Sequence, residues 1–271
     1  IHFFDMQKLS YDGALAHDLG LSTDLTPPLY ACDAVVGTVT EAAAARTGLL
    51  PGTPVVAGGL DAACGALGAG VYKAGQTQEQ GGQAGGMSIC TDRAVPHEKL
   101  ILSPHVAPGM WLLQGGTVGG GGALRWFRQE LGQGMRFDQL TAEAEQVPPG
   151  ADGLLFLPYM AGERSPIWDP DAKGVFCGLS FGKTRGHMVR AILEGAAFSL
   201  EHNLRVAAET GVEVDVLNAM GGASNSVLWT QIKADVTGRR MQVPGSDTAT
   251  ALGAALLAAV GVYLSRAGFL S

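Results

Sequence analysis

The sequence predicts an α/β protein with a mixed β-sheet and helices on both faces. Short apolar segments bounded by glycine alternate with helix-like segments through the later part of the chain, a pattern typical of helix-covered sheets. Hydrophobic residues make up 46% of the chain and charged residues only 16%, which excludes a disordered protein. Glycine occupies 40 of the 271 positions, about twice the usual frequency, so we expect many tight turns or close backbone approaches.

The first part of the chain predicts one short helix and one strand-turn-helix unit. We expect a helix at residues 41–47, where the sequence reads EAAAART. A buried strand at 54–57 follows, and a Gly58–Gly59 turn then leads to a helix of small residues that begins at Asp61. Residues 73–75 are typical of a boundary between segments.

The later part of the chain predicts the sheet and most of its helices. Two strands around a glycine-rich turn are expected at 76–82 and 86–91, and a third strand at 111–114. The elements expected after them are helices at 121–131 and 137–146, a strand at 154–158, a helix at 186–210, a strand at 214–220, a helix at 226–237, a strand at 240–243 and a helix at 248–264.

The expected helix at 186–210 carries charged pairs at a spacing of four residues. These are Arg190/Glu194 and Glu201/Arg205, and such pairs usually stabilise the exposed side of a helix. The opposite side carries Met188, Ala191, Ile192, Gly195 and Ser199. We therefore expect the charged pairs to form a solvated face.

Charge and cysteine spacing exclude several classes of protein. The net charge is −7 without a basic cluster, so we expect no nucleic acid partner. The four cysteines have no CxxC spacing, which indicates reduced thiols in the cytoplasm and neither a zinc site nor a disulfide framework. The start lacks both Met and a basic, apolar leader, so we expect no signal peptide and a natural start elsewhere. The uncharged segment 248–265 is mostly Ala and Gly, and we expect a soluble helix there and no membrane partner.

Three glycine clusters indicate where a ligand could bind. They are GGQAGG at 81–86, GGTVGGGGALRW at 115–126 and NAMGGASNS at 218–226. Glycine turns and helix N-termini direct backbone N–H groups at one point, so phosphate or a nucleotide is the natural ligand. The alternative is that the glycines only allow strands and helices to pack closely.

Asp61 is the acidic residue that most suggests catalysis. It follows a strand and a Gly-Gly turn and is surrounded by small residues. One interpretation is an N-cap of the following helix. The other is a general base that takes a proton from a substrate hydroxyl. Both interpretations remain open from the residues alone.

The stretch at 174–194 resembles the C-terminal signature of the FGGY carbohydrate kinases. The sequence there reads GVFCGLSFGKTRGHMVRAILE, and the positions that fill the signature are Gly174, Phe176, Gly178, Leu179, His187, Met188, Ala191 and Glu194. The stretches at 157–174, 221–238 and 251–262 resemble the pentulose-kinase branch of this family. The resemblance extends from about residue 37 to residue 262.

The resemblance implies an actin/hexokinase-like (ribonuclease H-like) fold, in which two domains close over ATP and a sugar. In this family the acid of a Gly-Gly turn is the catalytic base, and the matching residue is Asp61. The loop that cradles the ATP phosphates matches Gly82, Gln83, Ala84 and Gly85. Further nucleotide contacts match Gly121, Arg125, Gly221, Gly222, Asn225 and Ser226.

The chain departs from the family pattern in two places. The phosphate loop usually reads Gly-Thr-Ser/Gly-Gly, whereas Gln83 and Ala84 stand here, so a hydroxyl is missing. The Asp-x-Gly-Thr loop of the first domain is absent from these residues, and with it much of the sugar pocket. We therefore expect residues 1–75 to be the C-terminal end of the first, sugar-binding domain, so that this one of the two lobes is largely absent from the chain. Residues 76–271 would form the second, nucleotide-binding domain, and an apolar patch should be exposed where the rest of the first domain would pack.

The expected activity is ATP-dependent phosphorylation of a sugar hydroxyl, with Mg²⁺ on the phosphates and Asp61 as base. The expected substrate is a ketopentose such as xylulose. Gluconate, glycerol, a deoxy sugar or another pentulose or pentitol are alternatives within the class. A non-catalytic nucleotide-binding sugar sensor and an actin- or chaperone-like ATPase are alternatives from other classes. A small-molecule sugar is the expected partner, and a homodimer is left open.

Overall fold

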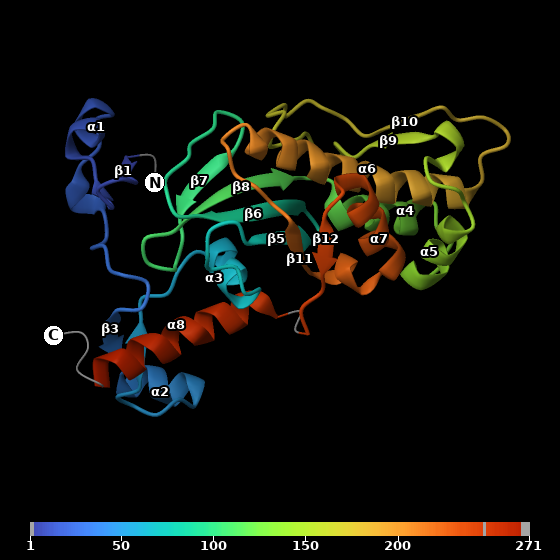
Figure 1. Cartoon of the computed structure of the whole chain (residues 1–271). Coiled ribbons are helices and arrows are strands. Elements are labelled where there is room, and N and C mark those ends of the chain that lie inside the picture. Colours follow the sequence, from blue (N-terminus) through green and yellow to red (C-terminus); the bar gives the residue numbers. More distant parts are fainter. Residues whose placement is uncertain (1–2, 246–247, 267–271) are drawn as a thin grey trace.

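A six-stranded mixed sheet forms the centre of the computed structural model, which describes residues 3–245 and 248–266 (Figure 1). The strand order is β12-β11-β5-β6-β8-β7. The pairs β5–β6, β6–β8 and β8–β7 are antiparallel, whereas β11 runs parallel to both β5 and β12. The strands are β5 (Thr77–Gly81), β6 (Gly85–Thr91), β7 (Ile101–Pro104), β8 (Trp111–Thr117), β11 (Val216–Met220) and β12 (Arg240–Gln242).

Helices cover both faces of this sheet, as the sequence predicts. Successive side chains of a strand point to opposite faces. Ile89 and Leu113 pack with residues of α6 (Arg185–Ala208). Their neighbours Cys90 and Leu112 pack on the other face, with residues of α3 (Asp61–Gly68) and α8 (Ala249–Arg266). The mixed α/β fold is thereby confirmed.

Three further helices pack around α6 at one end of the sheet. They are α4 (Gly120–Glu130), α5 (Phe137–Glu145) and α7 (Val227–Thr237). Leu124, Phe127, Leu140, Ile192 and Ile232 belong to one buried cluster that these four helices share. The helix bounds lie within a few residues of those expected from the sequence.

Several strands differ from expectation. β9 (Leu155–Leu157) lies outside the central sheet, and the sequence does not predict β1 (Phe4–Asp5), β2 (Ser10–Tyr11), β3 (Val35–Thr38), β7 and β10 (Val175–Cys177). β7 is not predicted, because it is a short edge strand that ends in Pro104, and strand signals are weakest at such edges. The segment expected at 154–158 forms β9, but β9 pairs only with β10 in a separate two-stranded sheet. A 3₁₀ turn, η2 (Ala151–Gly153), precedes β9.

The prediction of a solvated charged face on α6 is wrong for its first pair. Arg190 is only 7% exposed and Glu194 only 5%. Glu194 Oε1 accepts hydrogen bonds from Arg190 Nε at 2.7 Å and from the backbone N of Gly150 at 2.9 Å. Periodicity does not reveal that α5, α7 and the sheet all pack around this helix. The charges are tolerated there because they are paired and hydrogen-bonded.

The N-terminal part consists of small, separate elements. They are β1 (Phe4–Asp5), β2 (Ser10–Tyr11), α1 (Gly13–Asp18), η1 (Thr23–Leu25), β3 (Val35–Thr38), α2 (Glu41–Thr47) and β4 (Pro54–Val56). In Figure 1, α1 and β1 lie apart from the central sheet, whereas β3 and β4 pair with each other and contact α8.

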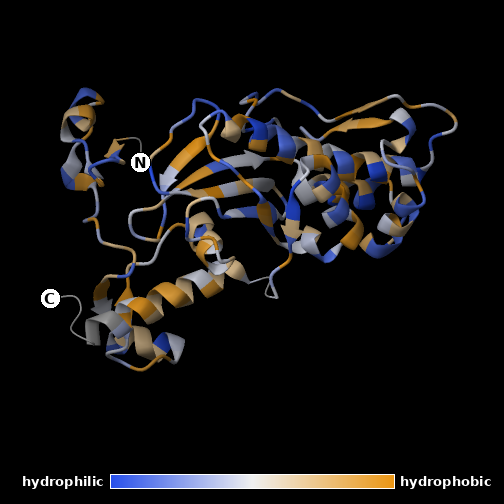
Figure 2. Cartoon of the chain, viewed as in Figure 1, coloured by the Kyte–Doolittle hydropathy of each residue, from blue (hydrophilic) through white to orange (hydrophobic). Residues whose placement is uncertain are grey.

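Exposed apolar side chains gather around α8, which Figure 2 shows largely in the colours of hydrophobic residues. Those exposed on α8, β3 and β4 are Val35, Val36, Val55, Leu252, Leu256, Val260 and Tyr263. An exposed apolar surface of this kind is what the sequence leads us to expect. Within the described ranges, no helix combines the length and the hydropathy that a membrane span requires.

Candidate functional site

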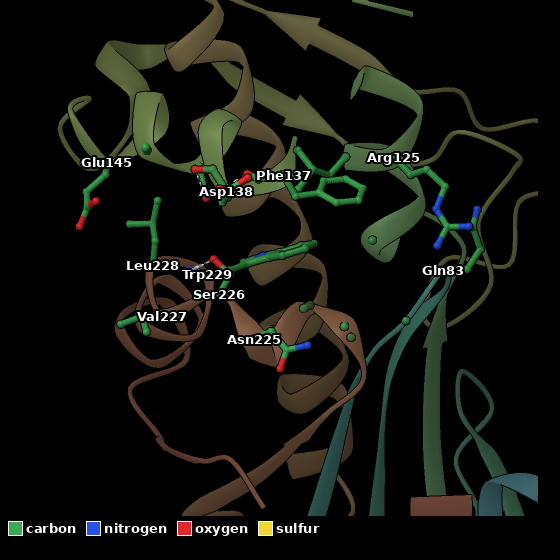
Figure 3. A pocket seen from close by; sticks show the side chains of 18 residues that line it. Gln83, Arg125, Phe137, Asp138, Glu145, Asn225, Ser226, Val227, Leu228 and Trp229 are labelled. Carbon is green, nitrogen blue, oxygen red and sulfur yellow. Dashed lines mark hydrogen bonds between the residues drawn. The ribbon is translucent and has the colours of Figure 1, made fainter. Parts of the chain in front are cut away.

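A pocket of about 630 Å³ lies between α4, α5 and α7 at the C-terminal end of β5 (Figure 3). Four segments provide its walls: the β5–β6 turn, the start of α4, one side of α5, and the turn that leads into α7. The lining residues are Gly81, Gly82, Gln83, Gly121, Leu124, Arg125, Phe137, Asp138, Thr141, Ala142, Glu145, Gly222, Ala223, Asn225, Ser226, Val227, Leu228 and Trp229. In Figure 3, Gln83 and Arg125 lie at one end of the pocket and Glu145 at the other.

The β5–β6 turn closes against the start of α4. Gly121 N donates to Gly82 O, and Gly122 N donates to Gln83 O, both at 2.8 Å. A Cβ on Gly121 would stand 2.5 Å from Gly82 O, so only glycine allows this approach. The packing interpretation therefore explains the glycines at the start of α4. Two N–H groups of the α4 first turn already have protein acceptors.

Gly82 and Gly222 have a different environment. A Cβ on Gly82 would meet only Ala84 O at 3.5 Å, and one on Gly222 would meet nothing within 4 Å. Neither residue has a positive φ. Packing and backbone conformation therefore do not require glycine at these two positions, although both line the pocket. Glycine without a folding role is typical of a place where a ligand approaches the backbone closely.

The turn after β11 is held by local hydrogen bonds. Gly221 has φ of 84° and precedes the 3₁₀ turn η3 (Gly222–Asn225). Ser226 Oγ accepts a hydrogen bond from Trp229 N at 3.3 Å and so caps α7. The Trp229 indole N–H donates to Leu193 O of α6 at 3.1 Å, which fixes the ring as a pocket wall. Asn225 is exposed and lines the pocket.

The α5 wall was not found by sequence motifs. Its residues Phe137, Asp138, Thr141, Ala142 and Glu145 line the pocket. Their spacing of three and four residues on a predicted helix is the one signal that places them on a common side. Asp138 accepts hydrogen bonds from Arg136, which lower the pKa of this carboxyl below its usual range.

The structure brings together most of the residues expected to contact nucleotide. Those that line the pocket are Gly82, Gln83, Gly121, Arg125, Gly222, Asn225 and Ser226. Ala84, Gly85 and Gly221 are not lining residues; Ala84 and Gly221 belong to the same two turns, and Gly85 begins β6.

Asp61 lies outside this set. It is exposed in the first turn of α3 and does not line the pocket. Its Oδ1 accepts a hydrogen bond from Ala62 N at 2.7 Å. The N-cap position belongs to Leu60, so the interpretation of Asp61 as an N-cap is wrong.

A buried acid supports the segment that enters α4. Glu163 Oε1 accepts hydrogen bonds from Val118 N at 2.9 Å and Arg164 N at 2.7 Å. Its Oε2 is buried and has no hydrogen-bond partner among the described residues. Burial raises the pKa of the Glu163 carboxyl. No cluster of three or more His, Cys, Asp or Glu side chains that could hold a metal occurs in the described part of the chain.

Comparisons with known proteins match nearly the whole chain. The model of the FGGY family of carbohydrate kinases, C-terminal domain, matches residues 86–262, and that of the N-terminal domain matches residues 1–68. Xylulose kinase from Bacillus subtilis is 35% identical over 257 residues, which are 94% of this chain and 51% of that protein. Gluconokinase from Bacillus licheniformis is 33% identical and matches 93% of this chain and 52% of its own length.

A solved structure also matches nearly the whole chain. The crystal structure of xylulose kinase from Rhodospirillum rubrum superposes with a TM-score of 0.85 and 35% sequence identity, over 96% of this chain and 53% of that one. The chain thus spans about half the length of the relatives it matches. Two family models that together account for most of its residues leave one assignment: this chain belongs to the FGGY family of carbohydrate kinases.

Proposed function

We propose that this chain provides the nucleotide site for ATP-dependent phosphorylation of a sugar hydroxyl. The observation that carries the proposal is the pocket, where two glycine turns from distant parts of the sequence meet. Glycine at positions 82 and 222 leaves the backbone of both turns accessible, although packing requires glycine at neither position. Family membership adds that ATP is the nucleotide.

The shape of the pocket suggests how ATP would lie in it. Adenosine would occupy the space between α5 and α7, against Trp229 and beside Asn225. The phosphates would extend towards the turn at 82–85, where Arg125 provides a positive charge. Backbone N–H groups of a glycine-rich turn can bind phosphate oxygens without a side chain. The absence of a threonine hydroxyl at position 83, where this chain has Gln83, therefore does not exclude phosphate binding.

Mg²⁺ would enter with the nucleotide. The described residues offer no group of three metal-binding side chains. This agrees with Mg²⁺ sites that are built mainly from phosphate oxygens and water. The ion would neutralise the phosphate charge during transfer.

Asp61 is the proposed general base. It would accept the proton of the sugar hydroxyl while the hydroxyl oxygen bonds to the γ-phosphorus and the bond to ADP breaks. Its exposed place at the start of α3 leaves the carboxylate accessible to a substrate. In this proposal residues 1–75 contribute the sugar side of the enzyme and residues 76–271 the nucleotide side.

Xylulose is the first proposed substrate and gluconate the second. Xylulose kinases and gluconokinases have similar identities to this chain, 35% and 33%. A non-catalytic sugar sensor is the alternative from another class, because Gln83 and Ala84 replace the usual phosphate loop. A cytoplasmic location is part of the proposal, in accordance with the free thiols of Cys32, Cys64, Cys90 and Cys177.

Two measurements test the proposal. Isothermal titration of this chain with ADP should show binding, and an absence of binding would contradict the nucleotide assignment. The encoded protein that contains this chain is then assayed for ADP release with xylulose, other pentuloses, gluconate and glycerol. Release that depends on one sugar supports a kinase, whereas ADP binding without release for any sugar supports the sensor. Light scattering of the same protein determines whether it is a homodimer.

A further inference from the structure

A buried ion pair lies beneath the two turns of the pocket. Lys233 Nζ of α7 is 2.6 Å from Glu79 Oε1 of β5, and the two side chains are 5% and 4% exposed. Glu79 Oε2 is also buried, without a hydrogen-bond partner in the described part of the chain. Removing two charges from water is costly, and a buried pair is weak evidence for stability on its own. The pair therefore suggests a role other than stability.

Its place in the fold connects the pocket walls. Glu79 is two residues before Gly81, and Lys233 is one helical turn after Trp229. Lys233 Nζ lies 5.0 Å from the centre of the Trp229 ring and 3.1 Å from the position of a Cβ on Gly81. Gly81 and Trp229 both line the pocket, so the ammonium group of Lys233 lies between the two parts of the pocket wall that these residues form.

The two turns also touch directly above this pair. A Cβ on Gly81 would stand 2.5 Å from Ala223 Cβ, and one on Gly221 would stand 3.0 Å from Gly81 O. The end of β5 and the turn that leads into α7 thus have little freedom to change their separation while Glu79 and Lys233 remain paired.

We propose that the Glu79–Lys233 ion pair is a positioning device that sets the spacing between the phosphate turn (82–85) and the adenosine turn (221–226). This inference rests on the proposed function, because it takes a nucleotide to be the ligand. The pair acts through the turns and does not touch the ligand. ADP extends over both turns and depends on their spacing, whereas adenosine contacts the second turn with α5 and α7.

The test compares ADP and adenosine by isothermal titration of this chain. Lys233→Met should raise the Kd of ADP about tenfold, and that of adenosine less than about threefold. Lys233→Arg keeps the positive charge and N–H donors for Glu79 and should restore ADP binding to within about threefold of wild type.

Glu79→Leu separates spacing from charge. This substitution removes the acceptor of Lys233 Nζ and leaves Lys233 under the phosphate turn. If the pair acts by setting the spacing of the two turns, ADP should bind more weakly, as in Lys233→Met. Tighter ADP binding would show that the ammonium charge itself acts on the phosphates, and would overturn the proposal.

Arg190→Met is the matched structural control. It breaks the Arg190–Glu194 pair, which is equally buried with side chains 8% and 6% exposed, but neither residue lines the pocket. Circular dichroism and thermal unfolding measure the fold of every variant. Both buried-pair variants should lose stability, and only Lys233→Met should lose ADP affinity. An equal loss of ADP affinity in Arg190→Met contradicts the positioning role.

A double variant covers the case in which Lys233→Met does not fold. Glu79→Leu/Lys233→Met leaves no unpaired buried charge and should show the same tenfold loss for ADP. Unchanged ADP affinity in any folded variant without the pair overturns the inference. If the wild-type chain itself binds no ADP, the proposed function fails and this inference with it.

Discussion

Gly121 donates its backbone N–H to the carbonyl oxygen of Gly82 at 2.8 Å, so the first turn of α4 closes against the β5–β6 turn. Gly122 repeats this contact with Gln83 O. Two N–H groups at the start of α4 are thereby unavailable to a phosphate. The exposed cation that α4 presents to this end of the pocket is Arg125, one helical turn further along.

Arg125→Ala should weaken ADP binding about fivefold at low salt, because a pair of charges about 4 Å apart in water contributes about 1 kcal/mol. The loss should shrink as salt is raised, since screening reduces such interactions. Titration of ADP at two salt concentrations measures this. Arg205→Ala removes an exposed arginine of α6 and serves as the control. ADP affinity that is equal in Arg125→Ala and wild type would refute a phosphate contact of Arg125.

Gly222→Ala should leave stability unchanged and weaken nucleotide binding. A Cβ at this position meets nothing within 4 Å and the φ is not positive, so the folded chain accommodates it. The added methyl group would occupy space at the pocket surface. Gly238→Ala is the contrasting variant, because Gly238 has φ of 64° and lies outside the pocket. It should lower the Tm and leave ADP affinity unaltered. Normal ADP affinity in Gly222→Ala would argue against close ligand approach there.

Asp61→Asn should lower kcat by about 10²- to 10⁴-fold, the usual contribution of a general base. The assay uses the encoded protein that contains this chain, with its best sugar substrate. ADP affinity should stay at the wild-type level because Asp61 does not line the pocket. Asp235→Asn, an exposed aspartate of α7, is the control. Near-normal turnover in Asp61→Asn would remove this residue from the base role.

Glu163→Gln should stabilise the chain relative to wild type, and increasingly so as pH rises. Burial raises the pKa of Glu163 above its ordinary value of 4.5. On raising the pH from below that value, the unfolded chain ionises first, so wild type loses stability until the pH passes the raised pKa. Glutamine cannot ionise, and its oxygen can still accept the hydrogen bonds from Val118 and Arg164.

Urea unfolding of both proteins between pH 4 and pH 8 measures this difference. Subtracting one curve from the other cancels the contributions of the remaining acids, including Asp138, whose lowered pKa acts in the opposite direction. A stability difference that is independent of pH would show that folding does not shift the pKa of Glu163.

Much of the local structure could be predicted from short stretches of sequence. The hairpin around 82–85 and the α7 cap at Ser226 depend on residues within a few positions of each other. Glycine turns and capping hydroxyls act over such distances. The helix positions were found for the same reason, whereas the seven pocket residues were identified from the family resemblance.

Other features depend on which elements pack together, and no local pattern contains that information. Arg190 and Glu194 have the spacing of a solvated pair, but α5 and α7 cover them. The α5 wall, with Phe137 and Glu145, joins the pocket only because α5 packs on α6 beside α7.

The sequence by itself determined the fold class, the family signature and the two glycine turns, because helix periodicity, strand alternation and turn chemistry are short-range properties. Only the tertiary structure decided that the turns meet at one pocket, and that Glu79 and Lys233 pair beneath it across 154 positions of sequence. Burial and ion pairing across such separations arise when distant elements exclude water together, and charge or hydropathy at a single position does not encode them.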